Sequence, residues 1–204
     1  MAQAVPRAAG WRLSSLPQPL EAEDVARLLS SCALTTVVGR RDLAILVLLA
    51  RLGLRAGEVA RLSLDDIDWQ AGEVTVHGKG STSERLPLPH EVGERLVGYL
   101  RQGRPPVEFR EVFVSMHAPL RPLSPIAVTQ VVAAACKRAG VEPVHAHRLR
   151  HTLASELLRA GTPLAQIAPI LRHASVATTA IYAKIDRDAL SVLARPWPLA
   201  GGES

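Results

Sequence analysis

The first part of the chain has apolar residues at helical spacing. Between residues 21 and 31 they occupy positions 22, 25, 26, 28 and 29, behind acidic residues in the first turn, which predicts an amphipathic helix. Residues 41–52 are mostly apolar and predict a second, more buried helix that Gly53 ends. Residues 56–62 predict a short third helix, with Arg55 at its start.

The spacing then changes to that of strands. Residues 67–69 and 73–77 predict a β-hairpin, and residues 85–88 predict a further short strand. The turn at residues 78–81 contains two glycines, which allow a close approach of the backbone. The pattern therefore predicts a small three-stranded antiparallel sheet with Lys79 on one of its turns.

The second half returns to helical spacing after an irregular, proline-rich stretch at 104–125, in which 112–114 predicts a short strand. Ser124, Pro125 and Gly140 have the positions expected of an N-cap, a first residue and a C-terminal stop. The predicted helices are 91–101, 125–139, 147–160, 163–171 (kinked or ended by Pro169), 178–182 and 186–194.

Domain organisation follows from where this periodicity is absent. Residues 1–19 predict a tail or linker and residues 196–204 a C-terminal tail, because both are rich in proline or glycine. Residues 20–195 then form one domain of mixed α+β class that is mainly α-helical. Hydrophobic residues make up 48% of the 204, which is typical of a globular protein. We find neither a membrane span nor a signal peptide, so we expect a cytoplasmic protein.

The charge suggests an anionic partner without identifying one. The net charge is +5, and of 24 basic residues only three are lysines, at positions 79, 137 and 184. A compositional drift toward arginine explains this balance, but a retained lysine also suits a site that must donate a proton, which arginine cannot do. Cys32 and Cys136 are isolated and are interpreted as small core residues.

Cleavage of a phosphodiester without a metal requires cations for the nonbridging oxygens, a nucleophile and an acid for the leaving oxygen. Arg55 and Arg150 are candidate cations, because each is predicted at a helix start or in a first turn, where backbone N–H groups also favour an anion. Tyr182 is the candidate nucleophile, since the other tyrosine, Tyr99, lies in an ordinary amphipathic helix.

Two metal-dependent alternatives are weaker. His145, His147 and His151 have spacing that can supply metal ligands, but neither cysteine nor a carboxylate cluster is nearby in the sequence. Asp65, Asp66 and Asp68 are clustered as in two-metal nucleases, yet a helix-to-strand connection explains them more simply. We therefore predict no metal and no cofactor.

Taken together, these motifs resemble the tyrosine recombinase (phage integrase-like) family over residues 19–195. The resemblance rests on their order and spacing: Arg55 with Gly57-Glu58, Lys79 in a glycine turn, His147-x-x-Arg150-His151, and Leu171-x-His173 nine residues before Tyr182.

The resemblance implies a role for each residue. Arg55 and Arg150 would clamp the scissile phosphate, and His173 would hydrogen-bond one of its oxygens. Lys79 would protonate the departing 5′ oxygen, and His147 would act as general base toward Tyr182, which would form a 3′-phosphotyrosyl bond. Glu58 would orient its neighbours, and His151 would be more structural than catalytic.

The chain departs from the family pattern in three respects. Arg172 replaces the usual glycine before His173, where it could contact DNA or face solvent, and Pro169 is unusual. Only about nineteen residues precede the catalytic region, where typical members have a further helical domain. Both a naturally short protein and a fragment fit this observation.

The implied partner is duplex DNA, bound by a homo-oligomer that forms a synaptic tetramer, with accessory or related recombinase subunits as further possible partners. Residues Asp186 to Leu193 would dock on a neighbouring subunit. The alternatives are a DNA-binding regulator, an inactive remnant of the same fold, and a DNA-relaxing enzyme of the type IB topoisomerase kind.

Overall fold

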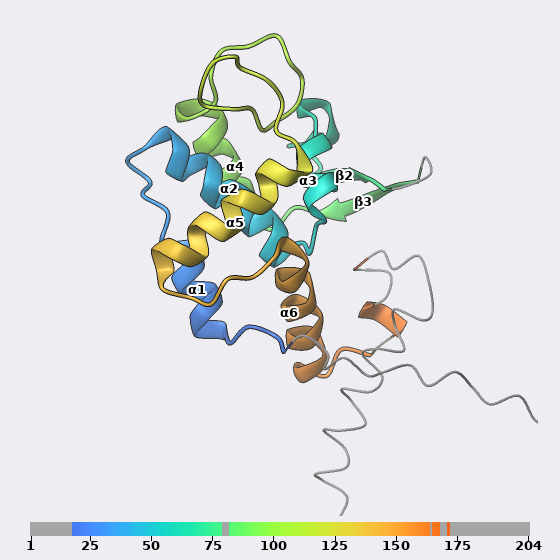
Figure 1. Ribbon diagram of the computed structural model, residues 1–204. Coiled ribbons are helices and arrows are strands. Elements are labelled where there is room, and N and C mark those ends of the chain that lie inside the picture. Colours follow the sequence, from blue (N-terminus) through green and yellow to red (C-terminus); the bar gives the residue numbers. More distant parts are fainter. Residues whose placement is uncertain (1–17, 79–81, 164, 168–170, 172–204) are drawn as a thin grey trace, which may run out of the picture.

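The computed structural model describes residues 18–78, 82–163, 165–167 and 171 (Figure 1). Helices dominate this part of the chain, which confirms the mainly helical α+β class. Its elements are α1 (Ala22–Ser30), α2 (Val37–Arg51), α3 (Ala56–Arg61), the 3₁₀ helix η1 (Leu64–Asp66), β1 (Ile67–Asp68), β2 (Glu73–His77), β3 (Ser83–Pro87), α4 (His90–Gln102), α5 (Pro125–Ala139) and α6 (Ala146–Arg159).

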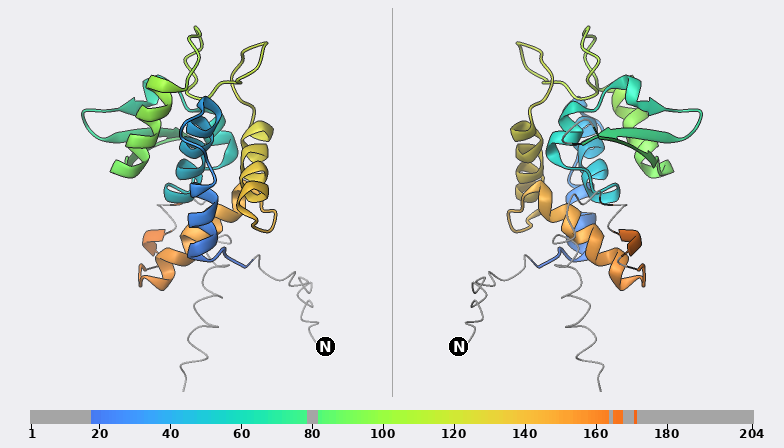
Figure 2. Two further views of the ribbon diagram at one scale, coloured as in Figure 1. Left: turned by 90° about the vertical axis from the view of Figure 1, so that its left-hand side faces the viewer. Right: turned by 90° about the vertical axis from the view of Figure 1, so that its right-hand side faces the viewer.

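Helix α2 is the centre of the core. Every residue from Asp42 to Ala50 is buried, and α2 packs against α1, α4, α5 and α6. Figure 2 shows α2 between α4 on one side and α5 on the other. The helix begins at Val37, four residues before the predicted start, because the Thr36 side chain accepts a hydrogen bond from the Gly39 N–H at 3.0 Å and caps it there.

The predicted three-stranded antiparallel sheet is confirmed, with the order β1-β2-β3. Val74 and Val76 point from β2 into the core, so alternate residues of this strand face outward. Strand β3 starts at Ser83 rather than at the predicted residue 85, because pairing of His77 with Ser83 extends the ladder toward the turn.

Helix α5 has the caps expected from its sequence. The Ser124 side chain accepts from the Ala127 N–H at 3.2 Å, Pro125 is the first residue, and Gly140 ends the helix with φ of 63°. The two cysteines are free and buried, as predicted. The predicted strand at 112–114 is wrong: this buried stretch makes a single β-bridge, between Val114 and Pro122, at the neck of a loop.

Some predicted elements fall outside the described residues. These are residues 1–17 of the N-terminal tail, the C-terminal tail, the helices at 178–182 and 186–194, and part of the helix at 163–171. Of this last helix, Ile167 and Leu171 are seen buried in a cluster with α6 side chains. Among the helices that are described, none combines the length and apolarity needed to cross a membrane.

Candidate active site

The first half of the site is built where α2 gives way to α3. Gly53 has φ of 58°, a left-handed conformation that turns the chain sharply after α2. Arg55 then takes the N-cap position of α3. The buried carboxylate of Glu58 accepts a hydrogen bond from the Arg55 backbone N–H at 2.7 Å and another from Arg55 Nη1 at 2.6 Å. Glu58 therefore holds both the backbone and the half-exposed guanidinium of Arg55 in place.

The second half is the start of α6. The helix begins at Ala146, so His147 is its second residue and Arg150 its fifth. The prediction that Arg150 lies in a first turn is therefore wrong, because only the first four N–H groups of a helix lack an intrahelical acceptor. The Arg150 side chain instead runs into the core, where it is 1% exposed, and Nη1 donates to the Gly53 carbonyl at 2.5 Å.

These two segments enclose a hollow of about 290 Å³, here called the α3–α6 hollow. It is lined by residues of the α3 start, of α5 and of the α6 start: Leu54, Arg55, Ala56, Thr129, His145, Ala146, His147 and Arg150. This is far more than the ~10–15 Å³ that a cavity needs to hold one water molecule. The structure thus brings together three of the predicted catalytic residues, Arg55, His147 and Arg150.

The arginines affect the histidines beside them. Partial burial lowers the pKa of His147, and the positive charges of Arg150 and Arg55 lower it further. Burial also lowers the pKa of His151 to about 4, with added effects from His147, Arg150 and Arg148. The two imidazoles meet edge to face, with ring centroids 4.3 Å apart. Both rings are therefore neutral at pH 7, and His147 is available as a proton acceptor.

Three predicted catalytic residues, Lys79, His173 and Tyr182, lie outside the described residues, as does Arg172. The flanks of the Lys79 turn are described. The Gly78 N–H donates to the Thr82 carbonyl at 2.8 Å, so the two flanks lie next to each other. Strand β2, which leads into this turn, packs against α3, the helix whose N-cap residue is Arg55.

The lining of the hollow also includes two polar residues that were not among the predicted catalytic residues. Thr129 comes from α5, and no pattern distinguishes it from other polar residues of that helix. His145, considered above only as a metal ligand, is the N-cap residue of α6. Within the described ranges, no three histidine, cysteine or acidic side chains gather in a way that could hold a metal ion.

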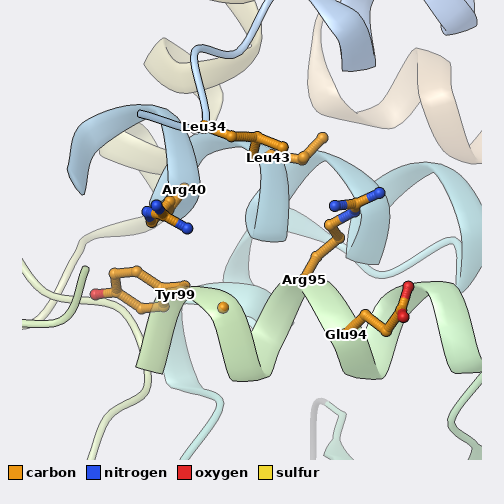
Figure 3. A pocket seen from close by; sticks show the side chains of 7 residues that line it. Leu34, Arg40, Leu43, Glu94, Arg95 and Tyr99 are labelled. Carbon is orange, nitrogen blue, oxygen red and sulfur yellow. The ribbon is translucent and has the colours of Figure 1, made fainter. Parts of the chain in front are cut away.

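A second hollow, of about 50 Å³, lies between α2 and α4 (Figure 3). This α2–α4 hollow is lined by Leu34, Arg40, Leu43, Glu94, Arg95, Gly98 and Tyr99. Tyr99 is fully buried, and burial raises the pKa of its phenol. In Figure 3 the Tyr99 hydroxyl points away from Arg95 and Glu94, and it accepts a long hydrogen bond, 3.5 Å, from the Val114 N–H. Tyr99 is thus a core residue.

Comparisons with known proteins point to one family of sequences. The sequence profile described as the phage integrase family matches residues 18–188. A Sinorhizobium fredii protein, provisionally named integrase/recombinase y4rA, is 49% identical over 97% of this chain and 49% of its own length. Tyrosine recombinase XerD of Listeria innocua is 34% identical over 85% of this chain and 60% of its own.

Among solved structures, the XerA recombinase has a TM-score of 0.74 at 27% identity, over 90% of this chain and 67% of that one. The chain spans about half the length of the first curated relatives it matches.

Proposed function

The chain belongs to the phage integrase family, and on this premise we propose that it is a site-specific tyrosine recombinase that cleaves and rejoins duplex DNA without a metal ion or cofactor. The observation that carries the proposal is the convergence of Arg55, His147 and Arg150 on one hollow, from segments nearly a hundred residues apart. Two fixed cations beside a neutral imidazole match what an anionic ester and a hydroxyl nucleophile require.

The scissile phosphate would bind between the two arginines. Arg150 is buried and fixed at Gly53, so its charge acts in a region of low dielectric, where electrostatic interactions are strong. Arg55 is 42% exposed and tied to Glu58, which leaves it at the entrance of the hollow. Both guanidiniums are positioned before substrate arrives, so little reorganisation is needed when charge develops on the nonbridging oxygens.

Cleavage requires two proton transfers, one from the nucleophile and one to the leaving oxygen. His147 takes the proton of the Tyr182 hydroxyl, and the phenolic oxygen forms a bond to phosphorus while the bond from phosphorus to the 5′ oxygen breaks. Lys79 gives a proton to that 5′ oxygen. The 3′-phosphotyrosyl ester keeps the energy of the broken bond, so attack by a second 5′ hydroxyl rejoins the strand by the reverse transfers. His173 would hydrogen-bond the phosphate.

Duplex DNA is the proposed partner, bound chiefly through its phosphates. We propose further that the active form is a homo-oligomer on DNA, a synaptic tetramer in which residues Asp186 to Leu193 dock on a neighbouring subunit. The division into a catalytic domain at 20–195 with short tails remains a prediction. A chain that stays monomeric at high concentration in the presence of its DNA site would contradict the tetramer.

The test is covalent trapping on DNA. The 204-residue chain is incubated with a library of nicked duplexes of random sequence. After cleavage near the nick, the short fragment between the cleavage point and the nick dissociates, so the strand cannot be rejoined and the adduct accumulates. We expect a covalent protein–DNA adduct that is absent from Tyr182→Phe, and sequencing of the captured ends should return one recurrent site. Absence of an adduct favours a DNA-binding regulator or an inactive remnant. Capture at unrelated sequences, with relaxation of supercoiled DNA, favours a topoisomerase-like enzyme.

A further inference from the structure

The imidazole of His77 is held on both of its ring nitrogens at the end of β2, two residues before Lys79. Nε2 lies 2.7 Å from Asp66 Oδ1, and Nδ1 lies 2.9 Å from the Ser83 hydroxyl. The neutral tautomer that satisfies both contacts has its proton on Nε2, donates it to Asp66 and accepts the Ser83 hydroxyl proton at Nδ1. His77 therefore bridges two segments of the chain.

The Asp66 end of this bridge is anchored in η1, the turn of helix that follows α3. Asp66 Oδ2 accepts a hydrogen bond from the Ser63 N–H at 2.8 Å, which caps η1 directly after α3, and the carboxylate is mostly buried. The last residue of α3, Arg61, reaches from Nη2 to the His77 carbonyl at 3.4 Å. One end of α3 thus contacts His77, while the other end carries Arg55 at its N-cap.

The Ser83 end of the bridge lies across the hairpin. His77 and Ser83 are the last cross-strand pair before the turn, and the hydrogen bond from Gly78 to Thr82 follows it. A β-ladder that ends next to a turn at the surface has few contacts to stop it from opening. The side-chain bridge joins the two strands at this point and joins both of them to η1, which directly follows α3.

The same three residue types form the catalytic triad of hydrolases, but the surroundings do not suit hydrolysis. The hollow beside His77, lined by residues such as Glu58, Thr75 and Val76, has no room for a water-sized molecule. A substrate would have no pocket there, whereas a mechanical role needs none.

We propose that the Asp66–His77–Ser83 bridge is a positioning device that fixes both flanks of the Lys79 turn relative to Arg55. The proposal rests on the function proposed above, in which Lys79 protonates the 5′ oxygen while Arg55 binds the phosphate. His77 touches no reacting atom in this scheme. It sets the distance between two groups that must act on the same phosphodiester, and misplacement by about 1 Å can cost about 100-fold in rate.

The experiment compares His77→Leu, Ser83→Ala and Lys79→Ala with the parent chain on two substrates. Thr75→Val, on the same outward face of β2, is the matched control. One substrate is a nicked duplex that carries the site recovered by covalent trapping. The other is the same duplex with sulfur in place of the scissile 5′ oxygen. A thiolate leaves without protonation because the pKa of a thiol is near 8.5, far below that of an alcohol, so the sulfur substrate bypasses the acid.

We expect His77→Leu to cleave the oxygen substrate about 10- to 100-fold more slowly, and Ser83→Ala to lose less. On the sulfur substrate His77→Leu and Ser83→Ala should approach the parent rate, as Lys79→Ala should. The DNA affinity and the thermal unfolding of His77→Leu and Ser83→Ala should stay close to those of Thr75→Val. Parent-like cleavage of the oxygen substrate by His77→Leu overturns the positioning role, and so does an equal loss on both substrates. A parent chain that forms no adduct with either substrate overturns the proposed function itself.

Discussion

The α3–α6 hollow and the α2–α4 hollow each contain two arginines, but they differ in room and in chemistry. The first holds about 290 Å³, with Arg55 and Arg150 beside two histidines. The second holds about 50 Å³, with Arg40 and Arg95 beside Glu94 and Tyr99. Arginines next to a tyrosine therefore do not by themselves make a site for phosphoryl chemistry. Space for the phosphate, and a neutral base next to the cations, distinguish the first hollow from the second.

The largest expected difference concerns the two tyrosines. Tyr182→Phe should abolish the covalent DNA adduct, because no other hydroxyl would replace the nucleophile. Tyr99→Phe should retain adduct formation and cost about 1–3 kcal/mol of unfolding free energy, since it takes the acceptor of a long hydrogen bond away from the buried Val114 N–H. Gel analysis of labelled DNA after denaturation measures the adduct of each variant, and urea unfolding measures the change in free energy. An adduct that depends on Tyr99 and survives Tyr182→Phe would reverse the assignment of the two tyrosines.

The arginines provide the next contrast. Arg150→Lys keeps the charge but loses the planar fork that can bind Gly53 and a phosphate oxygen together, so we expect cleavage to fall by about 10²- to 10³-fold. Arg95→Lys in the α2–α4 hollow should leave the rate unchanged. Single-turnover cleavage of the nicked substrate gives both values. Equal effects in the two hollows would remove the distinction drawn between them.

A pair of glycines tests the packing behind each hollow. A Cβ at Gly53 would meet Leu171 at 2.9 Å and would need a φ that L residues disfavour, so Gly53→Ala should destabilise the fold by about 1–3 kcal/mol and displace Arg150. Gly98 lies in α4 with open space around it, so Gly98→Ala should stabilise by about 0.5–1 kcal/mol. Urea unfolding measures these values, and a neutral Gly53→Ala would contradict the described contact.

The last contrast is acid sensitivity, which is expected for the α3–α6 side because His151 contacts His147 there. A pKa of about 4 for His151 means that the folded protein binds fewer protons than the unfolded chain between pH 4 and about 6.5. The free energy of unfolding is therefore highest above pH 6.5 and decreases as the pH falls toward 4. The expected loss is about 1–2 kcal/mol after allowance for the partial exposure of the ring. In His151→Gln the unfolding free energy, measured with urea at a series of pH values, should depend less on pH over that range. An unchanged slope would show that His151 does not titrate as described.

The sequence predicted the helices and strands well where their limits are set by neighbouring residues, such as caps and turns. The limits of α5 followed from Ser124, Pro125 and Gly140, and the hairpin followed from strand-like spacing beside a glycine turn. The start of α2 was missed because Val37 and Val38 are exposed apolar residues, so they do not mark the buried face of the helix.

The sequence named three of the residues that line the α3–α6 hollow but did not predict their arrangement. Arg55, His147 and Arg150 could be named from motifs, whereas the burial of Arg150 depends on a contact with Gly53 across 97 positions. No local pattern encodes such a contact, and the same holds for Thr129, which reaches the hollow only through the packing of α5 against α3. The catalytic roles of the three residues named from motifs, and of Lys79, His173 and Tyr182, stay predictions.

The most direct test of the phosphate site compares a charged and a neutral scissile group. The captured substrate is prepared with its scissile phosphate replaced by a methylphosphonate, which lacks the negative charge that the arginines would neutralise. Arg55→Ala should be slowed strongly on the phosphate and far less on the methylphosphonate, because the neutral group needs less help from a cation. An equal loss on both substrates would show that Arg55 does not act on the phosphate charge and would contradict the assignment of the α3–α6 hollow.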